Sequence, residues 1–313
     1  MIFLAGASGY VGERVLDDLL RLGHDVVAHV HSDRSREMMQ SKYPALRIVQ
    51  CDLANADEVR SIIPDCVRAV IYLPGLLRMS NGQTFEGVHV AGVRNLLAEF
   101  KKTPMKQSGE VEVRRWVHMS ALGVRPNAPQ KYYETKWRAE EMIRGSGLGW
   151  TILRPSLIFD DRRRRQHNFV SEIVRAIRMA PFIPILGSGK FVLQPVSVDD
   201  VSQTILQSLA KSETIQKTYE LGGPEKITYT EIMRRVARGI GSKKLALHIP
   251  MWLMFGSARL LQRFSWFPIT VDELQMLTSG NYIRDAEREQ EWRRMFNVPM
   301  KAFNEITLRQ AIE

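Results

Sequence analysis

Apolar residues recur along the first half of the chain with two alternating spacings. Short apolar runs predict strands, and each is followed by a segment with apolar residues every three or four positions, as at Val11, Val15, Leu19 and Leu22. The expected strands cover residues 2–5, 25–30, 46–50, 69–73, 116–119 and 150–153, and the expected helices 11–22, 34–41, 57–63, 84–101 and 133–143. Such alternation predicts an α/β fold with a doubly wound parallel sheet and helices on both faces.

After Pro155 the pattern becomes mostly helical. Helices are expected over 168–179, 199–210, 228–240, 250–264, 271–278 and 285–296, with short strands near 191–196 and 218–221. We therefore expect a sheet domain over 1–157, to which 197–222 returns, and a smaller, mostly helical lobe formed by 158–196 and 223–313. Ligands of such sheets bind at the carboxyl ends of the strands, so a substrate is expected between the sheet and the lobe.

Composition and charge narrow the classes of partner. With 313 residues and 44% hydrophobic content, the chain can bury a large core. The 44 Lys and Arg outnumber the 34 Asp and Glu, which favours anionic partners such as nucleotides or acidic lipid. No nucleic-acid motif accompanies this charge, and the run Arg162–Arg165 is expected to be a solvated loop.

The two cysteines, Cys51 and Cys66, have no metal-ligand spacing, so neither a metal site nor a disulfide framework is expected. The chain starts directly with a predicted strand, which indicates no signal peptide. Its longest apolar stretch, near 246–256, is too short to span a bilayer. These features predict a cytoplasmic protein.

Three glycines follow the first predicted strand at intervals of three residues, in the run GASGYVG. Gly6 permits a tight turn, Gly9 lets a phosphate approach the backbone, and Gly12 allows the helix to pack against the sheet. The helix N-terminus then directs N–H groups and partial positive charge at an anion. The spacing favours a dinucleotide diphosphate site, although a glycine-rich turn can also be purely structural.

A candidate catalytic set lies near the fifth predicted strand. Tyr132 and Lys136 share one face of a helix, and Ser120 follows the strand at its carboxyl end. An adjacent ammonium is expected to lower the pKa of a phenol from its usual value of about 10, which makes Tyr132 a usable proton donor and acceptor. The alternatives are an exposed helix face and the competing phenol of Tyr133.

Taken together, these motifs resemble those of the extended or atypical short-chain dehydrogenases/reductases, which have an NAD(P)-binding Rossmann fold. Within this epimerase/dehydratase-like superfamily, the chain resembles the group related to the nucleotide-binding accessory subunit of respiratory complex I. The likeness covers nearly the whole chain. It is carried by GASGYVG, by CDL at 51–53, by VHMSALGV at 117–124, by YYETK at 132–136, by WTILRPSLIF at 150–159, by QPVSVDDV at 194–201, by YELGGPE at 219–225 and by PITVDELQMLTSGN at 268–281.

The resemblance implies roles for individual residues. The diphosphate is expected on Gly6, Ser8, Gly9, Tyr10, Val11 and Gly12. Asp52 and Leu53 are expected at the adenine, and Leu73, Pro74 and Gly75 along the ribose. Ser120 would orient a substrate, Tyr132 would move the proton, and Lys136 would bind the nicotinamide ribose, with Pro155 and Ser156 beside the nicotinamide.

Two departures from the family pattern affect the expected chemistry. His89 stands where relatives often have an Asn of the proton relay, so it is either a relay or a packed polar residue. Asp160 and Asp161, followed by the arginine run, replace the usual glycine beside the substrate cleft, which argues against a sugar-nucleotide substrate.

The end of the second predicted strand bears on cofactor choice. A carboxylate there selects NAD, whereas a basic residue accepts the 2′-phosphate of NADP. The strand closes with His31, and Arg34 and Arg36 follow, so NADP(H) is expected over NAD(H). Asp33 is the argument for NAD, because a modest backbone shift would direct its carboxylate at the 2′-hydroxyl of the ribose.

The segment 248–267 is apolar and aromatic, with Arg259 and Arg263 within it. It is either a core helix with snorkelling arginines or a surface helix that contacts a membrane or membrane complex.

The sequence leaves two main functions open. The first is an oxidoreductase that transfers hydride between nicotinamide and a carbonyl or hydroxyl of a small, partly apolar substrate, with Tyr132 as general acid/base. The alternative is a non-catalytic NADP(H)-binding accessory or assembly subunit of a respiratory or membrane complex, peripheral to the inner face of a membrane. A dinucleotide redox sensor has only the basic charge in its favour.

Overall fold

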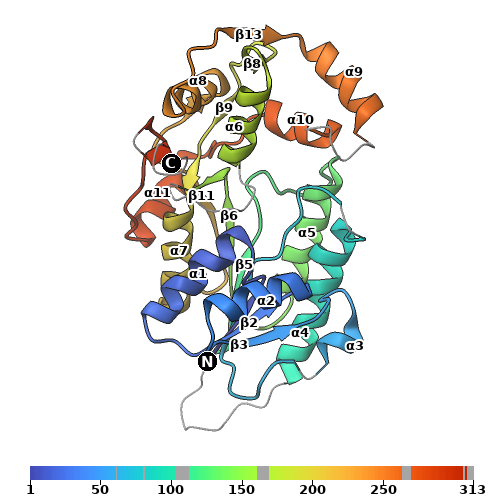
Figure 1. Cartoon of the computed structure of the whole chain (residues 1–313). Coiled ribbons are helices and arrows are strands. Elements are labelled where there is room, and N and C mark those ends of the chain that lie inside the picture. Colours follow the sequence, from blue (N-terminus) through green and yellow to red (C-terminus); the bar gives the residue numbers. More distant parts are fainter. Residues whose placement is uncertain are drawn as a thin grey trace. The chain divides into compact units, whose positions relative to one another are not determined.

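The computed structural model describes residues 1–60, 62–79, 82–102, 113–160, 169–262, 269–305 and 307–308. The chain divides into two compact units. Unit 1 comprises Met1–Arg154 and Val201–Tyr219, and unit 2 comprises Pro155–Asp200 and Glu220–Glu313. The chain therefore leaves unit 1 after Arg154, returns at Val201 and leaves again after Tyr219 (Figure 1).

A seven-stranded parallel sheet confirms the predicted fold class. Its strand order is β11-β6-β5-β4-β1-β2-β3. The strands are β1 (Ile2–Ala5), β2 (Val26–Val30), β3 (Arg47–Gln50), β4 (Ala69–Tyr72), β5 (Arg115–Met119), β6 (Gly149–Pro155) and β11 (Lys217–Leu221). Strand order reverses beside β1, which pairs with β2 on one side and β4 on the other. This reversal is the switch point at which such sheets bind ligands.

Helices flank this sheet where the apolar spacing predicts them. They are α1 (Tyr10–Arg21), α2 (Asp33–Lys42), α3 (Ala56–Val59), α4 (Gly92–Lys102), α5 (Lys131–Arg144), α7 (Val198–Ala210) and a 3-10 turn at Ser212–Thr214. Two segments differ from expectation. The helix predicted over 57–63 is the single turn α3, and the one predicted over 84–101 begins as a π-helix, Glu86–Ala91, before α4.

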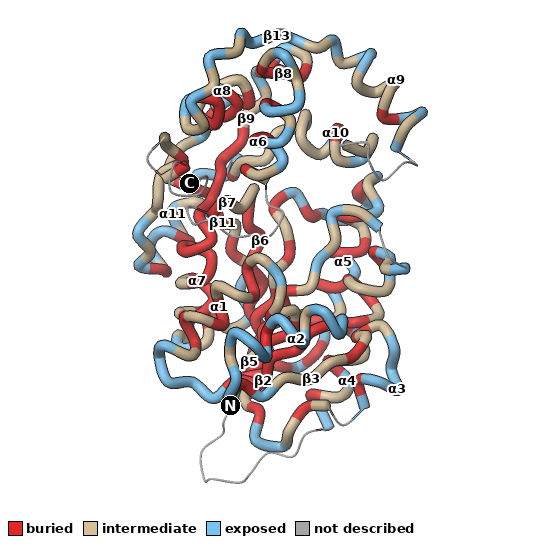
Figure 2. Tube along the Cα trace, in the orientation of Figure 1, coloured by how far each residue is buried: buried red, intermediate tan, exposed pale blue. Residues whose placement is uncertain are grey.

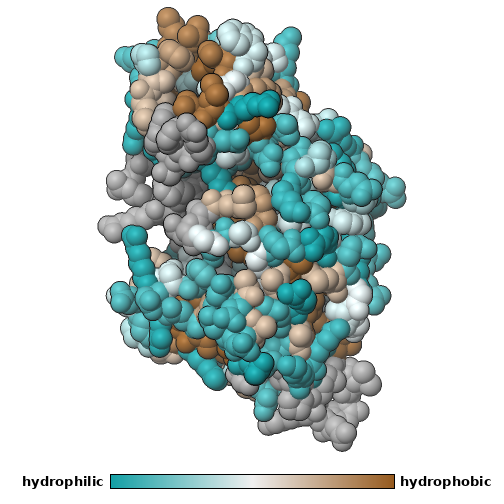
Figure 3. Space-filling model, turned by 90° about the vertical axis from the view of Figure 1, so that its right-hand side faces the viewer, coloured by the Kyte–Doolittle hydropathy of each residue, from teal (hydrophilic) through white to brown (hydrophobic). Residues whose placement is uncertain are grey.

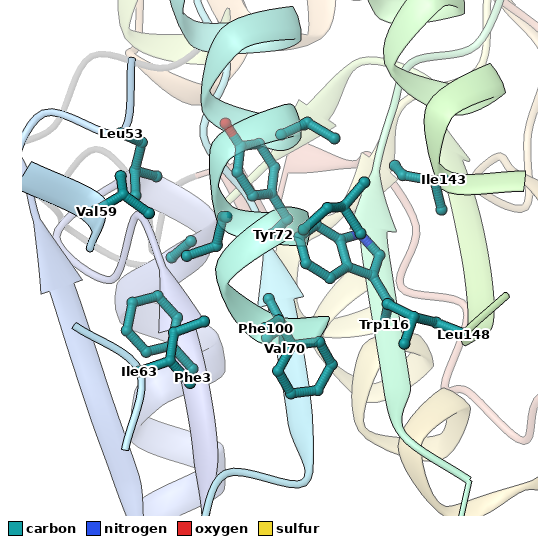
Figure 4. Close-up of a cluster of buried hydrophobic side chains, with 14 of the residues drawn as sticks. Phe3, Leu53, Val59, Ile63, Val70, Tyr72, Phe100, Trp116, Ile143 and Leu148 are labelled. Carbon is teal, nitrogen blue, oxygen red and sulfur yellow. The ribbon is translucent and has the colours of Figure 1, made fainter. Parts of the chain in front are cut away.

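One hydrophobic cluster of unit 1 lies between the sheet and α4 and α5, as Figure 4 shows. Trp116 of β5 and Tyr72 of β4 stack with ring centroids 5.9 Å apart, and Phe100 of α4 packs below them. The Tyr72 hydroxyl donates to the Val88 carbonyl at 2.6 Å. Strands of the sheet are buried along most of their length (Figure 2), as expected when both faces are covered.

Unit 2 is mostly helical, as the sequence predicts, with strand pairs between its helices. Its helices are α6 (Phe169–Met179), α8 (Tyr229–Gly239), α9 (Met251–Leu261), α10 (Val271–Thr278) and α11 (Ala286–Met295). Its strands are β7 (Ile158–Phe159), β8 (Ile183–Leu186), β9 (Val192–Leu193), β10 (Val196–Ser197), β12 (Ile227–Thr228) and β13 (Ala246–Ile249). They pair as β10-β7, β12-β9 and β13-β8. A second hydrophobic cluster, which includes Phe159, Ile177, Ile232 and Phe303, holds this unit together.

Among the helices that the structure describes, none has both the length and the apolar character needed to cross a bilayer.

Candidate functional site

The glycine turn after β1 has the geometry that a dinucleotide diphosphate requires. Gly6 has a φ of +76°, a left-handed conformation that favours glycine. A Cβ on Gly12 would stand 2.0 Å from the Gly6 carbonyl oxygen, so only glycine fits where α1 crosses the turn. Gly9 is the N-cap of α1 and has no side chain to occupy the helix terminus. No N-cap side chain therefore stands between the N-terminus of α1 and an anion at this turn.

A histidine that was not predicted from the sequence as a site residue fixes this turn. The Gly6 N–H donates to Nδ1 of His29 at 3.2 Å, and Nε2 of His29 lies 3.1 Å from the Cys51 carbonyl oxygen. Since Nδ1 accepts, the proton is on Nε2, and burial lowers the pKa of His29 to about 4. The neutral ring thus ties the turn to the end of β3. The sequence feature that could have indicated this role is the single His within the apolar run VVAHV.

The end of β2 places the predicted cofactor-selecting side chains at the surface. His31 and Arg34 are exposed, and Ser32 caps α2 by accepting from the Ser35 N–H. The Asp33 carboxylate accepts from the Gln50 amide at 3.0 Å. Nδ1 of His31 lies 4.0 Å from a carboxylate oxygen of Asp52, so two predicted cofactor residues are neighbours.

The predicted adenine residues differ in their surroundings. The Asp52 side chain is half exposed and accepts from the Ala54 N–H at 2.9 Å. Leu53 is buried in the cluster of Figure 4, where it faces Val59. The Asn95 amide of α4 donates to the Leu53 and Ala54 carbonyls, both at 3.0 Å, and so fixes this loop.

The loop after β4 brings two predicted groups together. A Cβ on Gly6 would lie 3.2 Å from the Pro74 ring, and a Cβ on Gly75 would lie 3.3 Å from Nζ of Lys136. Leu73 is buried and donates its N–H to the Ala5 carbonyl. The glycine turn, the loop after β4 and Lys136 therefore form one continuous site.

Lys136 and Tyr132 are both buried on α5, but their electrostatics differ from the sequence prediction. Nζ of Lys136 donates to the Met119 carbonyl at 3.0 Å, and burial lowers the pKa of Lys136 to about 8. Burial also raises the pKa of Tyr132, and the neighbouring Tyr133 phenol raises it further. The expected lowering by an adjacent ammonium is therefore wrong, because loss of solvation dominates.

The Tyr132 ring lies edge-on among other aromatic rings. Its centroid is 6.0 Å from that of Phe85, 5.5 Å from that of His89 and 5.3 Å from that of Tyr133. The competing phenol, Tyr133, is buried against Gly123, since a Cβ there would lie 3.2 Å from its hydroxyl.

His89 occupies the π-helix before α4, an irregularity common at functional sites. The Leu76 N–H donates to its Nε2 at 3.2 Å, so Nδ1 carries the proton and bonds the Thr135 hydroxyl at 2.9 Å. Burial lowers the pKa of His89 to about 2. The ring is thus a neutral brace between the loop after β4 and α5, which matches the packed alternative rather than a relay.

Ser120 is held by a buried carboxylate. Its hydroxyl donates to Glu140 at 2.5 Å. Glu140 also accepts from Nε and Nη2 of Arg154, at 2.9 and 2.6 Å, and from Nη2 of Arg144 at 2.6 Å. This cluster was not predicted from the sequence. The feature that indicates it is an acidic residue one turn after Lys136 on the same helix face.

The remaining predicted residues belong to unit 2. Pro155 ends β6, and the Ser156 hydroxyl donates to the Gln194 carbonyl. The Ser156 N–H donates to the Leu221 carbonyl at 2.8 Å. Asp160 is buried, while Asp161 and the arginine run lie outside the described residues. The described part of the chain contains no cluster of His, Cys, Asp or Glu able to hold a metal ion.

A glycine turn at the switch point of a doubly wound parallel sheet defines a dinucleotide-binding Rossmann domain. The NAD(P)H-binding family model matches residues 6–212, and the chain belongs to this family.

Similar proteins include respiratory-chain subunits. The mitochondrial NADH-ubiquinone oxidoreductase 40 kDa subunit of Neurospora crassa is 26% identical over 276 residues, which cover 86% of this chain and 68% of that protein. Subunit 9 of the NADH dehydrogenase 1 alpha subcomplex from Arabidopsis thaliana is 25% identical, over 72% of this chain. The chain spans only 54% of that relative's length. The resemblance to the complex I accessory-subunit group is confirmed.

Solved structures of the epimerase/dehydratase family share the fold. UDP-glucose 4-epimerase from Thermotoga maritima with UDP-glucose has a TM-score of 0.70 at 15% identity, covering 99% of this chain and 97% of that one. UDP-glucuronic acid 4-epimerase from Bacillus cereus in complex with NAD has a TM-score of 0.64 at 16% identity, covering 80% and 86%.

Proposed function

We propose that this chain binds NADP(H) and holds it as the cofactor-carrying component of a membrane-associated assembly. The observation that carries the proposal is the 2.0 Å approach that a Gly12 Cβ would make to the Gly6 carbonyl. It supports a backbone turn shaped for a diphosphate, because the helix N-terminus then faces the turn without a side chain between them. Lys136, beside Gly75, is suited to the hydroxyls of a ribose.

NADP(H) rather than NAD(H) is supported by charge at the end of β2. His31 and Arg34 are exposed there, and Asp33 is engaged with Gln50. A guanidinium pairs well with a 2′-phosphate, whereas a carboxylate that accepts from another side chain is less available to a 2′-hydroxyl.

Binding is tested by titrating the purified chain with NADPH and NADH. The expected result is tighter binding of NADPH, with Gly12→Val abolishing binding of both and Arg34→Ala removing the preference. Gly145→Ala is the matched control, because a Cβ there meets only ordinary contacts, 3.6 Å from the Glu141 carbonyl. Equal affinity for both cofactors would refute the NADP(H) assignment, and no binding of either would refute the function.

A role without turnover is supported by the state of the candidate catalytic groups. The Ser120 hydroxyl is directed at Glu140, the Lys136 ammonium at a carbonyl, and the Tyr132 phenol has a raised pKa. A phenol of raised pKa is a weaker acid toward a substrate carbonyl. The similarity to subunits of mitochondrial NADH dehydrogenase supports the same role. On this basis we propose that the chain lies peripheral to the inner face of a membrane.

Hydride transfer is the second candidate, favoured by the retention of Ser120, Tyr132 and Lys136 at one end of the sheet. A reduced nicotinamide would supply the hydride to the carbonyl carbon of a small, partly apolar substrate. Tyr132 would donate its phenolic proton to the oxygen, which gives an alcohol, and would recover the proton from solvent. Lys136 would orient the cofactor ribose.

The variant Tyr132→Phe separates the two candidates. If the chain only holds the cofactor, the variant binds NADPH as the wild type does and supports the cellular role unchanged. If the chain reduces a substrate, the variant retains NADPH binding but loses substrate-dependent NADPH oxidation. That second pattern would contradict the role without turnover.

A further inference from the structure

We propose that the surface around α9 in unit 2 binds the headgroup layer of a membrane rich in anionic lipid. This inference rests on the membrane contact proposed above and adds the chemistry of the partner and the residues that meet it. The α9 surface is defined by its apolar members, Met179, Leu245, Leu247, Trp252, Leu253 and Leu260, and its basic members, Arg178, Lys243 and Arg259.

Helix α9 has an apolar face that is not covered within the described residues. Trp252 is 76% exposed, Leu253 47% and Leu260 71%. These positions, together with exposed Gly256, lie one and two turns apart and therefore share one side of the helix. Of the described residues of α9, Ala258 alone is fully buried. A surface helix of a soluble domain normally has polar residues on this side, so the pattern needs a partner.

Strand β13 extends the same surface. Leu245 is 84% and Leu247 52% exposed, and Pro250 joins the strand directly to α9. The Lys244 ammonium donates to the carbonyls of Ile177, Arg178 and Ala180, which brings the end of α6 alongside. That end carries exposed Met179 and Arg178. Figure 3 shows brown atoms gathered at the top of the view, over the α9 end of unit 2.

Charge identifies the partner as anionic. Residues 232–271 contain seven Lys and Arg and no Asp or Glu, in a chain with 34 acidic residues overall. Within this stretch Arg235 and Arg238 of α8 pair with glutamates outside it: Glu231 of the same helix, Glu225 and Glu305. Lys243 and Arg259 are instead exposed beside the apolar residues. The stretch thus presents a net positive, apolar surface.

An interfacial membrane site needs this combination. Trp and Leu side chains enter the boundary between headgroups and acyl chains, while Lys and Arg contact lipid phosphates. Each cation near an anionic bilayer strengthens binding, and the two contributions act together. A protein interface does not require one sign of charge around an apolar centre, so the absence of acidic residues between 232 and 271 favours lipid.

The test is sedimentation of the full chain with vesicles at low salt. We expect binding to vesicles of equal parts phosphatidylcholine and phosphatidylglycerol, and little binding to phosphatidylcholine alone. Trp252→Ser/Leu260→Ser and Lys243→Glu/Arg259→Glu should each weaken binding about tenfold or more. The matched controls are Leu22→Ser/Met38→Ser and Lys101→Glu/Lys217→Glu, which alter exposed apolar and basic residues of unit 1.

Two outcomes overturn the proposal. One is the absence of binding to anionic vesicles, or binding that the α9 variants do not change. The other is concentration-dependent self-association that the Trp252→Ser/Leu260→Ser variant abolishes while vesicles remain unbound, which assigns the surface to a second copy of the chain. NADPH affinity is measured on every variant. A variant that loses vesicle binding but keeps NADPH binding tests the α9 surface alone. A variant that loses NADPH binding but keeps vesicle binding tests the cofactor site alone.

Discussion

At the residue scale, the neutral imidazole of His29 holds the glycine turn. His29 accepts from the Gly6 N–H and its Nε2 lies 3.1 Å from the Cys51 carbonyl oxygen, so one ring bonds two backbone groups. We therefore expect cofactor binding to depend on a side chain outside the glycine motif.

The variant His29→Phe tests this dependence. Phenylalanine keeps the ring near Phe3 but cannot accept from the Gly6 N–H, so a loss of about 1–3 kcal/mol of unfolding free energy is expected, together with weaker NADPH binding. Denaturant unfolding and NADPH titration measure the two effects. His24→Phe, at an exposed position, is the control. An unchanged unfolding midpoint in His29→Phe would count against the bridging role.

Glu140 provides a second prediction at this scale. Its carboxylate is fully buried between Arg154 and Arg144, so Glu140→Gln leaves buried positive charge without its counterion. A destabilisation of about 3–5 kcal/mol is expected in urea unfolding. The neighbouring Glu141 pairs with Arg144 at the surface, and Glu141→Gln should change stability by less than about 1 kcal/mol. Equal effects of the two variants would show that the cluster is not the stabilising feature.

At the scale of elements, α1 is fixed to α7 by a buried carboxylate. Asp18 is fully buried, accepts from the Ser202 hydroxyl at 2.7 Å and pairs with Arg14 at 3.0 Å and Arg21 at 2.8 Å. Asp18→Ala should therefore lower the unfolding free energy by about 1–3 kcal/mol in urea. Asp25→Ala, at an exposed position, should lie within about 0.5 kcal/mol of wild type. A small effect at Asp18 would mean that apolar packing alone holds α1.

Most elements of unit 1 could be predicted from the sequence, because burial on both sheet faces gives strands such as 2–5 and 69–73 short, continuous apolar runs. Shorter elements could not. The π-helix at Glu86–Ala91 depends on packing around His89, and the two-residue strands of unit 2 depend on pairing between distant segments. The candidate site was also predictable only in part. The glycine spacing predicted the turn, whereas His29 and Glu140 act through contacts between residues far apart in the sequence, which spacing does not reveal.

At the scale of the whole molecule, buried neutral histidines make stability depend on pH. Burial lowers the pKa of His29 to about 4 and of His89 to about 2, and it lowers the pKa of His118. The unfolded chain therefore takes up protons below the usual pKa of about 6.5 that the folded chain does not accept. The contribution of these histidines to stability is complete above that pH and is lost as the pH decreases toward 4.

His29 alone should account for a loss of about 3 kcal/mol between pH 6.5 and 4. Asp200 offsets part of this loss. Burial raises its pKa to about 6, so the folded chain binds a proton there before the unfolded chain does and gains stability as the pH falls. Urea unfolding at successive pH values measures the balance. In His29→Phe the decline should be shallower, and an identical slope would argue against this assignment.

The order of strands has a consequence for how the chain can be synthesised and divided. The last strand of the central sheet, β11, starts at Lys217, long after β6 ends at Pro155, and the first segment of unit 2 is made in between. A nascent chain released after residue 154 would therefore expose the outer edge of β6 and lack α7. Such a fragment is a template for aggregation rather than an independent domain, so the halves of this protein should not be separable by simple truncation.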